Sequence, residues 1–134
     1  MNPRALAAQI SIARMGFGVA FMLAPEWAGG MWIGKDASRS GTKLFIRALG
    51  ARDLALGLGT LLAMRHDRPT RGWLEASGLA DFADAVITLM AGDDIPPASK
   101  KGVPPFAAAS AALCELVGSR VDLGREQVKH AAQA

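Results

Sequence analysis

The sequence contains no tyrosine, a single cysteine and few charged side chains, and each scarcity excludes a class of protein. Cys114 has no partner for an internal disulfide or a cysteine-based metal cluster, and we expect it to pack as a small apolar residue in a helix. Charged residues make up only 20% of 134, with a formal net charge of +3. Because the basic residues are not interleaved with aromatic ones, we expect no nucleic-acid partner.

Motifs for metals and cofactors are missing as well. Both histidines, His66 and His130, lie in hydrophilic segments, a basic loop and a polar tail. The stretch GLGT at 57–60 lacks the lysine that follows in a phosphate-binding loop. Carboxylates alone can hold a hard cation, but the arginines beside them oppose it. We therefore predict no metal and no cofactor.

Apolar residues make up 51% of the chain and gather in four long segments between charged loops. We predict helices over 5–23, 42–64, 73–91 and from 104 to at least 118, with 123 as the furthest end. Each is close to the ~20 residues that cross a bilayer, the fourth only marginally. No alternation typical of strands and no internal repeat is present. The prediction is an all-α fold, a four-transmembrane-helix bundle in residues 1–124, followed by a polar tail, 125–134.

Proline and tryptophan support these boundaries. Pro25 opposes continuation of the first helix, and Pro104 suits the first turn of the fourth. Trp27, Trp32 and Trp73 lie at segment ends, where interfacial anchors are found, and the stretch AGGMWIG at 28–34 fits a segment along the interface. The N-terminal segment lacks a signal peptidase site and is expected to remain as a helix.

The loop charges give an orientation. With four crossings the N-terminus, the loop 65–71 and the tail share one side, and they carry a modest excess of arginine and lysine. The positive-inside rule then predicts a multi-pass protein of the cell (inner) membrane with both termini in the cytoplasm. A soluble four-helix bundle is the alternative. It requires a broad polar face on every helix, and between residues 5 and 23 only Gln9, Ser11 and Arg14 are polar.

Ionisable residues inside the predicted spans are the candidate functional residues, because a charge in mid-bilayer costs about 2.5–3.5 kcal/mol and needs partners or water. Asp81 and Asp84 are three residues apart and share a helix face with Thr88, so their charges call for a cation between them. The second span contributes a stripe of Arg47, Asp53 and glycines, with Arg52 directed elsewhere. The full set is Arg14, Arg47, Arg52, Asp53, Glu75, Asp81, Asp84 and Glu115.

Small residues on two of the segments should let the helices approach closely around these charges. They are Gly50, Gly57 and Gly59 on the second segment and the alanines with Ser110 at 107–112 on the fourth. The stretch RALGARDLALGLG at 47–59 resembles a family of small actinobacterial four-helix membrane proteins of unknown function, through its R-x-x-G-x-R-D core. The resemblance implies an integral membrane protein and brings no assigned activity.

Three functions are compatible with the charged residues. The first is an acid–base enzyme that opens an epoxide or cyclises a lipophilic small molecule, similar in residue kinds to limonene-epoxide-hydrolase-like enzymes, whose fold is unrelated. Asp81 and Asp84 would be its acid and base, Arg47 or Arg52 the bridging cation and Asp53 an orienting group or an alternative base. Arg14, Glu115 and Thr88 would support the substrate.

The second function is structural: the charges fix helix packing in a membrane subunit. The third is a proton-coupled transporter that uses Glu115 or Asp84, although neighbouring arginines and the lack of an inverted repeat disfavour it. The bilayer is the expected partner in every case. The small-residue faces leave a monomer, a homodimer and a larger membrane assembly open.

Overall fold

The computed structural model describes residues 2–131, and their side chains as far as Val121. Within this range the chain is helical with short connections, which confirms the all-α prediction. The elements are α1 (Pro3–Leu23), α2 (Pro25–Ile33), η1 (Gly34–Ser38), α3 (Ser40–Arg65), α4 (Arg71–Met90), η2 (Gly92–Asp94) and α5 (Pro97–Ala131). The first three predicted segments are found with shifts of about two residues at their starts.

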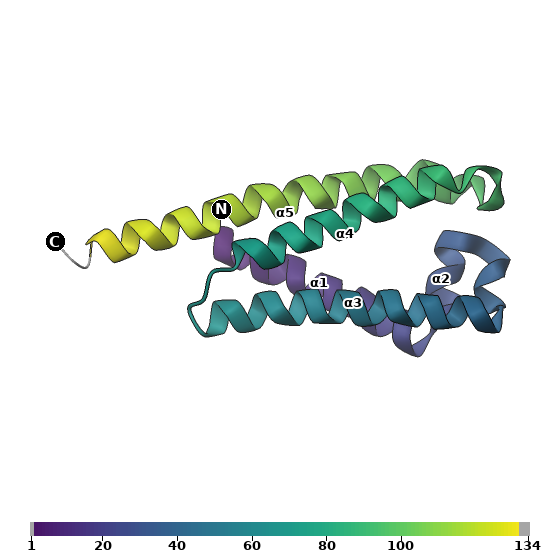
Figure 1. The fold of residues 1–134 in the computed structure, drawn as a ribbon, viewed down its shortest axis with the longest axis horizontal. Helices are drawn as coiled ribbons and strands as arrows, with labels where there is room; N and C mark the ends of the chain where they lie inside the picture. Colours follow the sequence, from purple (N-terminus) through teal and green to yellow (C-terminus); the bar gives the residue numbers. More distant parts are fainter. Residues whose placement is uncertain (1, 132–134) are drawn as a thin grey trace.

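The four long helices form two pairs (Figure 1). Helix α1 packs mainly along α3, and α4 along α5, whereas α3 and α4 contact each other much less although a short loop joins them. Helix α2 lies at the end of the molecule opposite that loop, and α5 extends beyond the other helices (Figure 1). The molecule is thus two tight helix pairs with a weaker contact surface between α3 and α4, which we call the α3–α4 seam.

The α1–α3 pair is close because glycines remove side chains from the contact. A Cβ placed on Gly18 of α1 would lie 2.7 Å from the Gly50 carbonyl oxygen, and one on Gly50 would lie 2.7 Å from that of Gly18. About two helical turns further along α3, a Cβ on Gly57 would lie 2.7 Å from the Ser11 carbonyl oxygen. Backbone therefore meets backbone along this pair, in the manner of small-residue helix contacts.

The predicted interfacial stretch AGGMWIG forms most of α2 and is tied to the helices around it. Gly29 packs against the Ile46 side chain of α3. Trp32 is half-buried and its Nε1 donates a hydrogen bond of 3.0 Å to Thr88 Oγ1 on α4. At the start of α5, Ser99 Oγ donates to the Met31 carbonyl oxygen at 3.2 Å. Trp32 is therefore engaged inside the protein, a role the anchor prediction did not include.

The predicted start of the last helix is wrong. Helix α5 begins at Pro97, so proline occupies its first turn there, and Pro104 and Pro105 lie inside it. Proline in a helix interior lacks the N–H for a bond to the carbonyl four residues earlier, which is why the sequence pattern favoured a start at 104. The helix also continues to Ala131, through the boundary predicted at 124; residues 132–134 lie outside the described range.

Among the described helices, α1 alone is long and apolar enough to cross a bilayer by length and composition. That finding taken alone is weak, because a core helix of a soluble protein passes the same criterion, and so does a signal sequence near the N-terminus, where α1 lies. In α1, however, only 22% of the apolar stretch is buried. A soluble core helix of this composition would be mostly covered by its neighbours.

Candidate functional site: a buried arginine–aspartate cluster

Three helices contribute five charged side chains to one cluster at the centre of the bundle. Arg14 comes from α1, Arg52 and Asp53 from α3, and Asp81 and Asp84 from α4. We call these five residues the central cluster. All five were candidate site residues in the sequence, and the structure brings them together.

Arg14 is the buried centre of this cluster. Its Nη1 donates to Asp53 Oδ1 at 3.1 Å and its Nη2 to Asp81 Oδ2 at 2.5 Å. The Nη2 group also reaches the Ser77 carbonyl oxygen at 3.5 Å. The Arg14 side chain is only 7% exposed. One guanidinium therefore joins α1 to α3 and α4 at the same point, and charge-assisted bonds of this kind are stronger than neutral ones.

Arg52 forms the second half of the cluster across the α3–α4 seam. Its Nη1 and Nη2 donate to the two oxygens of Asp84 at 3.0 and 2.8 Å, which is bidentate pairing. Its Nε and Nη2 also donate to Asp53 Oδ1 at 3.2 and 3.1 Å. Asp53 is thus shared by both arginines, and the predicted cation between Asp81 and Asp84 is in fact two guanidiniums, one on each carboxylate.

Hydroxyl groups complete the surroundings of the cluster. Ser110 of α5 donates from Oγ to Asp81 Oδ2 at 2.6 Å, so the fourth long helix also reaches the charged centre. Ser11 and Ser77 are buried beside it, and their hydroxyls bond to carbonyl oxygens one turn back on their own helices. Arg14 Nε is buried with no hydrogen-bond partner among the described residues.

The cluster has a sealed side and an open edge. The Arg14, Asp53 and Asp81 side chains are 7–12% exposed. Arg52 is 30% exposed, and its partner Asp84 14%. The central cluster as a whole has a formal charge of −1, from two arginines and three aspartates. No group of three or more metal-ligating side chains was found among the described residues.

Four candidate residues from the sequence lie outside the central cluster. Arg47 is exposed, and its Nε donates to the Met22 carbonyl oxygen at 3.2 Å, so it is not the bridging cation. Glu115 is exposed on α5 and forms no ion pair with a described residue. Thr88 is buried one turn beyond Asp84, accepting from Trp32 and donating to the Asp84 carbonyl oxygen at 2.6 Å. Glu75 pairs with Arg71 on the surface of α4.

Two features of the site were missed by the sequence reasoning. Gly18 was not singled out, and Ser110 was taken as a packing residue only. A signal for Gly18 was present: Ala7, Ser11, Arg14 and Gly18 are spaced by four, three and four residues, and all four are buried. That spacing marks one helix face, and the small polar residues on it identify the face turned toward the charges.

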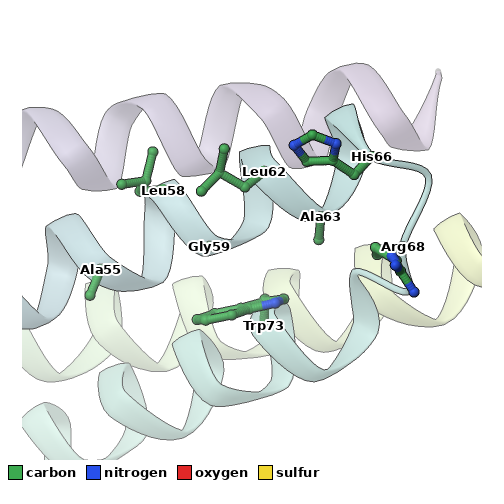
Figure 2. Close-up of a pocket in the computed structure, with 8 residues that line it drawn as sticks. All are labelled: Ala55, Leu58, Gly59, Leu62, Ala63, His66, Arg68 and Trp73. Carbon is green, nitrogen blue, oxygen red and sulfur yellow. The ribbon is translucent and has the colours of Figure 1, made fainter.

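An open groove lies away from the cluster, at the end of the α3–α4 seam next to the loop (Figure 2). Its volume is about 710 Å³. None of its lining residues belongs to the central cluster; they are Ala55, Leu58, Gly59, Leu62, Ala63, His66, Arg68 and Trp73.

Comparison of this chain with models of known protein families, with curated proteins and with solved structures finds no match. The site is accordingly interpreted from its own geometry.

Proposed function

We propose that this chain is a membrane-embedded four-helix protein in which α1, α3, α4 and α5 cross the bilayer and the central cluster fixes how they pack. The observation that carries this proposal is the inverted polarity of the bundle. Charged and hydroxyl side chains lie in its interior beside small apolar residues and a short apolar core around Leu74, and many large apolar side chains lie on its outside. A soluble bundle has the opposite arrangement.

The outer surface is apolar on every long helix. Examples are Ile12 at 60% exposed on α1, Phe45 at 71% on α3 and Phe106 at 66% on α5. On α4 a whole face is apolar and exposed, comprising Leu79, Phe82, Val86, Ile87, Leu89 and Met90. Single exposed apolar residues are ordinary in soluble proteins, but contiguous apolar surface on this scale is typical of contact with lipid or with another protein.

Charged side chains buried in the interior explain why α3 and α4 are less apolar in composition than α1. The charges that lower their hydropathy include Asp53, Asp81 and Asp84, which point into the cluster and away from the surface. Ionisable residues in membrane helices are expected to face the bundle interior and to pair there. With 26 residues in α3 and 20 in α4, both helices have the length of a bilayer crossing. Four crossings place both termini on the side of the α3–α4 loop, which the positive-inside rule assigns to the cytoplasm.

A packing role for the cluster is favoured over acid–base chemistry because each of its carboxylates accepts from an arginine. A general base must be free to take a proton from its substrate, and a proton carrier must bind and release one. The groove that could admit a ligand is lined by none of these residues. Chemistry on a lipophilic substrate is the second candidate, and the partly exposed Arg52–Asp84 edge is the observation in its favour.

The test uses purified protein in detergent and in liposomes. We expect the wild-type chain to stay with the membrane after alkaline carbonate extraction. We expect Asp81→Asn to lower its thermal unfolding temperature strongly, because Arg14 loses a buried ionic partner, whereas Glu115→Gln on the surface of α5 should leave it unchanged. Extraction of wild-type protein into the soluble fraction would contradict membrane embedding. Equal stability of Asp81→Asn and Glu115→Gln would refute the packing role.

A further inference from the structure

We propose that the groove at the loop end of the α3–α4 seam binds one anionic phospholipid, with its acyl chain along the apolar wall and its phosphate at Arg68. This inference rests on the proposed membrane embedding. It assigns a ligand to a surface that takes no part in the central cluster.

The groove wall on α3 is two parallel rows of side chains. Ala55, Gly59 and Ala63 form one row, with Leu58, Leu62 and His66 beside them (Figure 2). Leu58 and Leu62 are 47% and 45% exposed, so the wall is apolar and uncovered. These six residues repeat at four-residue spacing and therefore run along the helix as a strip.

The α4 side of the groove is the ring of Trp73, which lies across the gap beneath Gly59 (Figure 2). A Cβ on Gly59 would come 2.3 Å from this ring, so the indole packs directly on bare backbone. The ring is 41% exposed. An indole at this position offers a flat apolar surface to a chain lying in the groove, and tryptophan favours the headgroup level of a bilayer.

The length of the groove along α3 matches the hydrocarbon thickness of one leaflet. From Ala55 to His66 is about 16 Å at ~1.5 Å per residue. Half of a ~30 Å hydrocarbon core is about 15 Å. A volume of about 710 Å³ also lies within the range of small-molecule sites, roughly 300–1,000 Å³. The strip is therefore long enough for an acyl chain that starts at the headgroup level.

The charged end of the groove selects the headgroup. Arg68 and His66 line it, and the Arg68 side chain forms no ion pair with another described residue. The acid of this loop, Asp67, is contacted by Arg4 at 3.4 Å. As far as the described side chains go, the loop therefore presents a cation without an acidic partner beside an apolar strip, on the side where the proposed topology places anionic lipid. Basic pockets between membrane helices on that side suit anionic headgroups.

The experiment follows Trp73 fluorescence in liposomes. In the variant carrying Trp27→Phe and Trp32→Phe, Trp73 is the single tryptophan, and bromine on an acyl chain quenches it on contact. We compare phosphatidylglycerol and phosphatidylcholine brominated at the same carbons. We expect half-quenching at about fivefold lower mole fraction of the anionic lipid, the factor of one arginine near the surface.

Three variants test which residues cause the preference for the anionic lipid. Arg68→Gln should bring the two lipids to equal half-quenching fractions. Ala55→Phe, which fills the exposed apolar end of the groove, should remove the tight component for both. Lys101→Gln, an exposed cation at the opposite end of the bundle, serves as the matched control and should keep the preference.

Each other outcome overturns the inference in a distinguishable way. Equal quenching by both lipids in the Arg68-containing protein means that Trp73 meets bulk lipid only, which leaves membrane embedding intact and refutes the site. Tighter quenching by a brominated free fatty acid than by phosphatidylglycerol assigns the groove to a carboxylate amphiphile and refutes the phospholipid. Absence of quenching of all three tryptophans in the wild-type chain contradicts the membrane embedding itself.

Discussion

The middle of the α3–α4 seam and its loop end are built in different ways. Toward its middle, Arg52 of α3 holds Asp84 of α4 through two hydrogen bonds, and the seam is closed. Toward the loop the same two helices meet where the Trp73 ring packs on the backbone at Gly59, and an open groove runs beside that contact. The comparison teaches that charge pairing holds the middle of the seam, whereas apolar contacts join the two helix pairs toward the loop. There an apolar cluster of Ala7, Leu74, Val117 and Val121 also links α1 to α4 and α5. The following predictions alter one side of that contrast or, for reference, a contact away from the seam.

The largest effect is expected from Arg14→Gln. It leaves Asp81 buried without its cation and Asp53 with Arg52 alone, and breaking a buried pair in this way costs about 3–5 kcal/mol. Thermal unfolding in detergent, followed by circular dichroism, measures the loss. Arg47→Gln is the matched control, because Arg47 is an exposed arginine outside the cluster. Comparable losses in the two variants would contradict the central position of Arg14.

A somewhat smaller effect is expected from Gly18→Ala, which acts within the α1–α3 pair and not on the seam. Its Cβ meets the Gly50 carbonyl oxygen and the Leu54 backbone nitrogen within 3 Å, so the helices must separate. Overpacking of this kind costs about 1–3 kcal/mol. Gly16→Ala, two residues earlier, meets nothing within 4 Å and should be neutral or slightly stabilising through helix propensity. Thermal unfolding in detergent distinguishes the expected loss of stability in Gly18→Ala from the neutral effect of Gly16→Ala.

At the open end of the seam, Ala55→Leu should change stability by less than about 0.5 kcal/mol, because surface substitutions away from packed features stay within that range. The same enlargement at Ala85, a buried alanine on α4, should cost about 1–3 kcal/mol. Denaturant titration of both variants gives the difference. A large loss at Ala55 would show that the loop end of the seam is packed as tightly as the rest.

The smallest effect lies outside the seam, at the turn between α4 and α5. Lys100 bonds to Asp93 there, and this lowers the pKa of the Asp93 carboxyl below its ordinary value. An aspartate with a lowered pKa stabilises the fold above its ordinary pKa of about 4, and that contribution disappears as the pH falls through the lowered value. Because Asp93 is fully exposed, the gain is small.

Asp93→Asn tests this turn. At neutral pH we expect a slight decrease in unfolding temperature relative to wild type, and the difference should vanish in acid. A difference that grows on acidification would reverse the assigned sign.

Much of this architecture was predictable because it follows from hydropathy and spacing. Asp81 and Asp84 share a helix face by their three-residue separation, and their need for cations followed from charge alone. Which arginine serves which carboxylate did not follow, because helix rotation and crossing decide it. Arg47 lies on the same helix face as Gly50 and Asp53. It comes about one and a half turns before Asp53, and from there its long side chain reaches the Met22 carbonyl oxygen at the surface.

The error at the start of α5 has a different origin. Local proline preferences placed the start at Pro104, whereas tertiary contacts extend the helix back to Pro97, through the bond from Ser99 to the Met31 carbonyl oxygen. The groove was not predictable either. It lies beside the contact of the Trp73 ring with the backbone at Gly59, and such a contact between helices is not encoded in the periodicity of either helix.

The position of Arg14 also has a consequence for biosynthesis. Its partners Asp53 and Asp81 follow it by 39 and 67 residues. At about 5–20 residues per second, the last partner emerges about 3–13 s after Arg14 itself. Under the proposed membrane embedding, the Arg14 cation therefore has Asp53 as its first partner once α3 has been made, and it is fully paired only when α4 follows. The order of synthesis, and not only the finished bundle, is constrained by this one side chain.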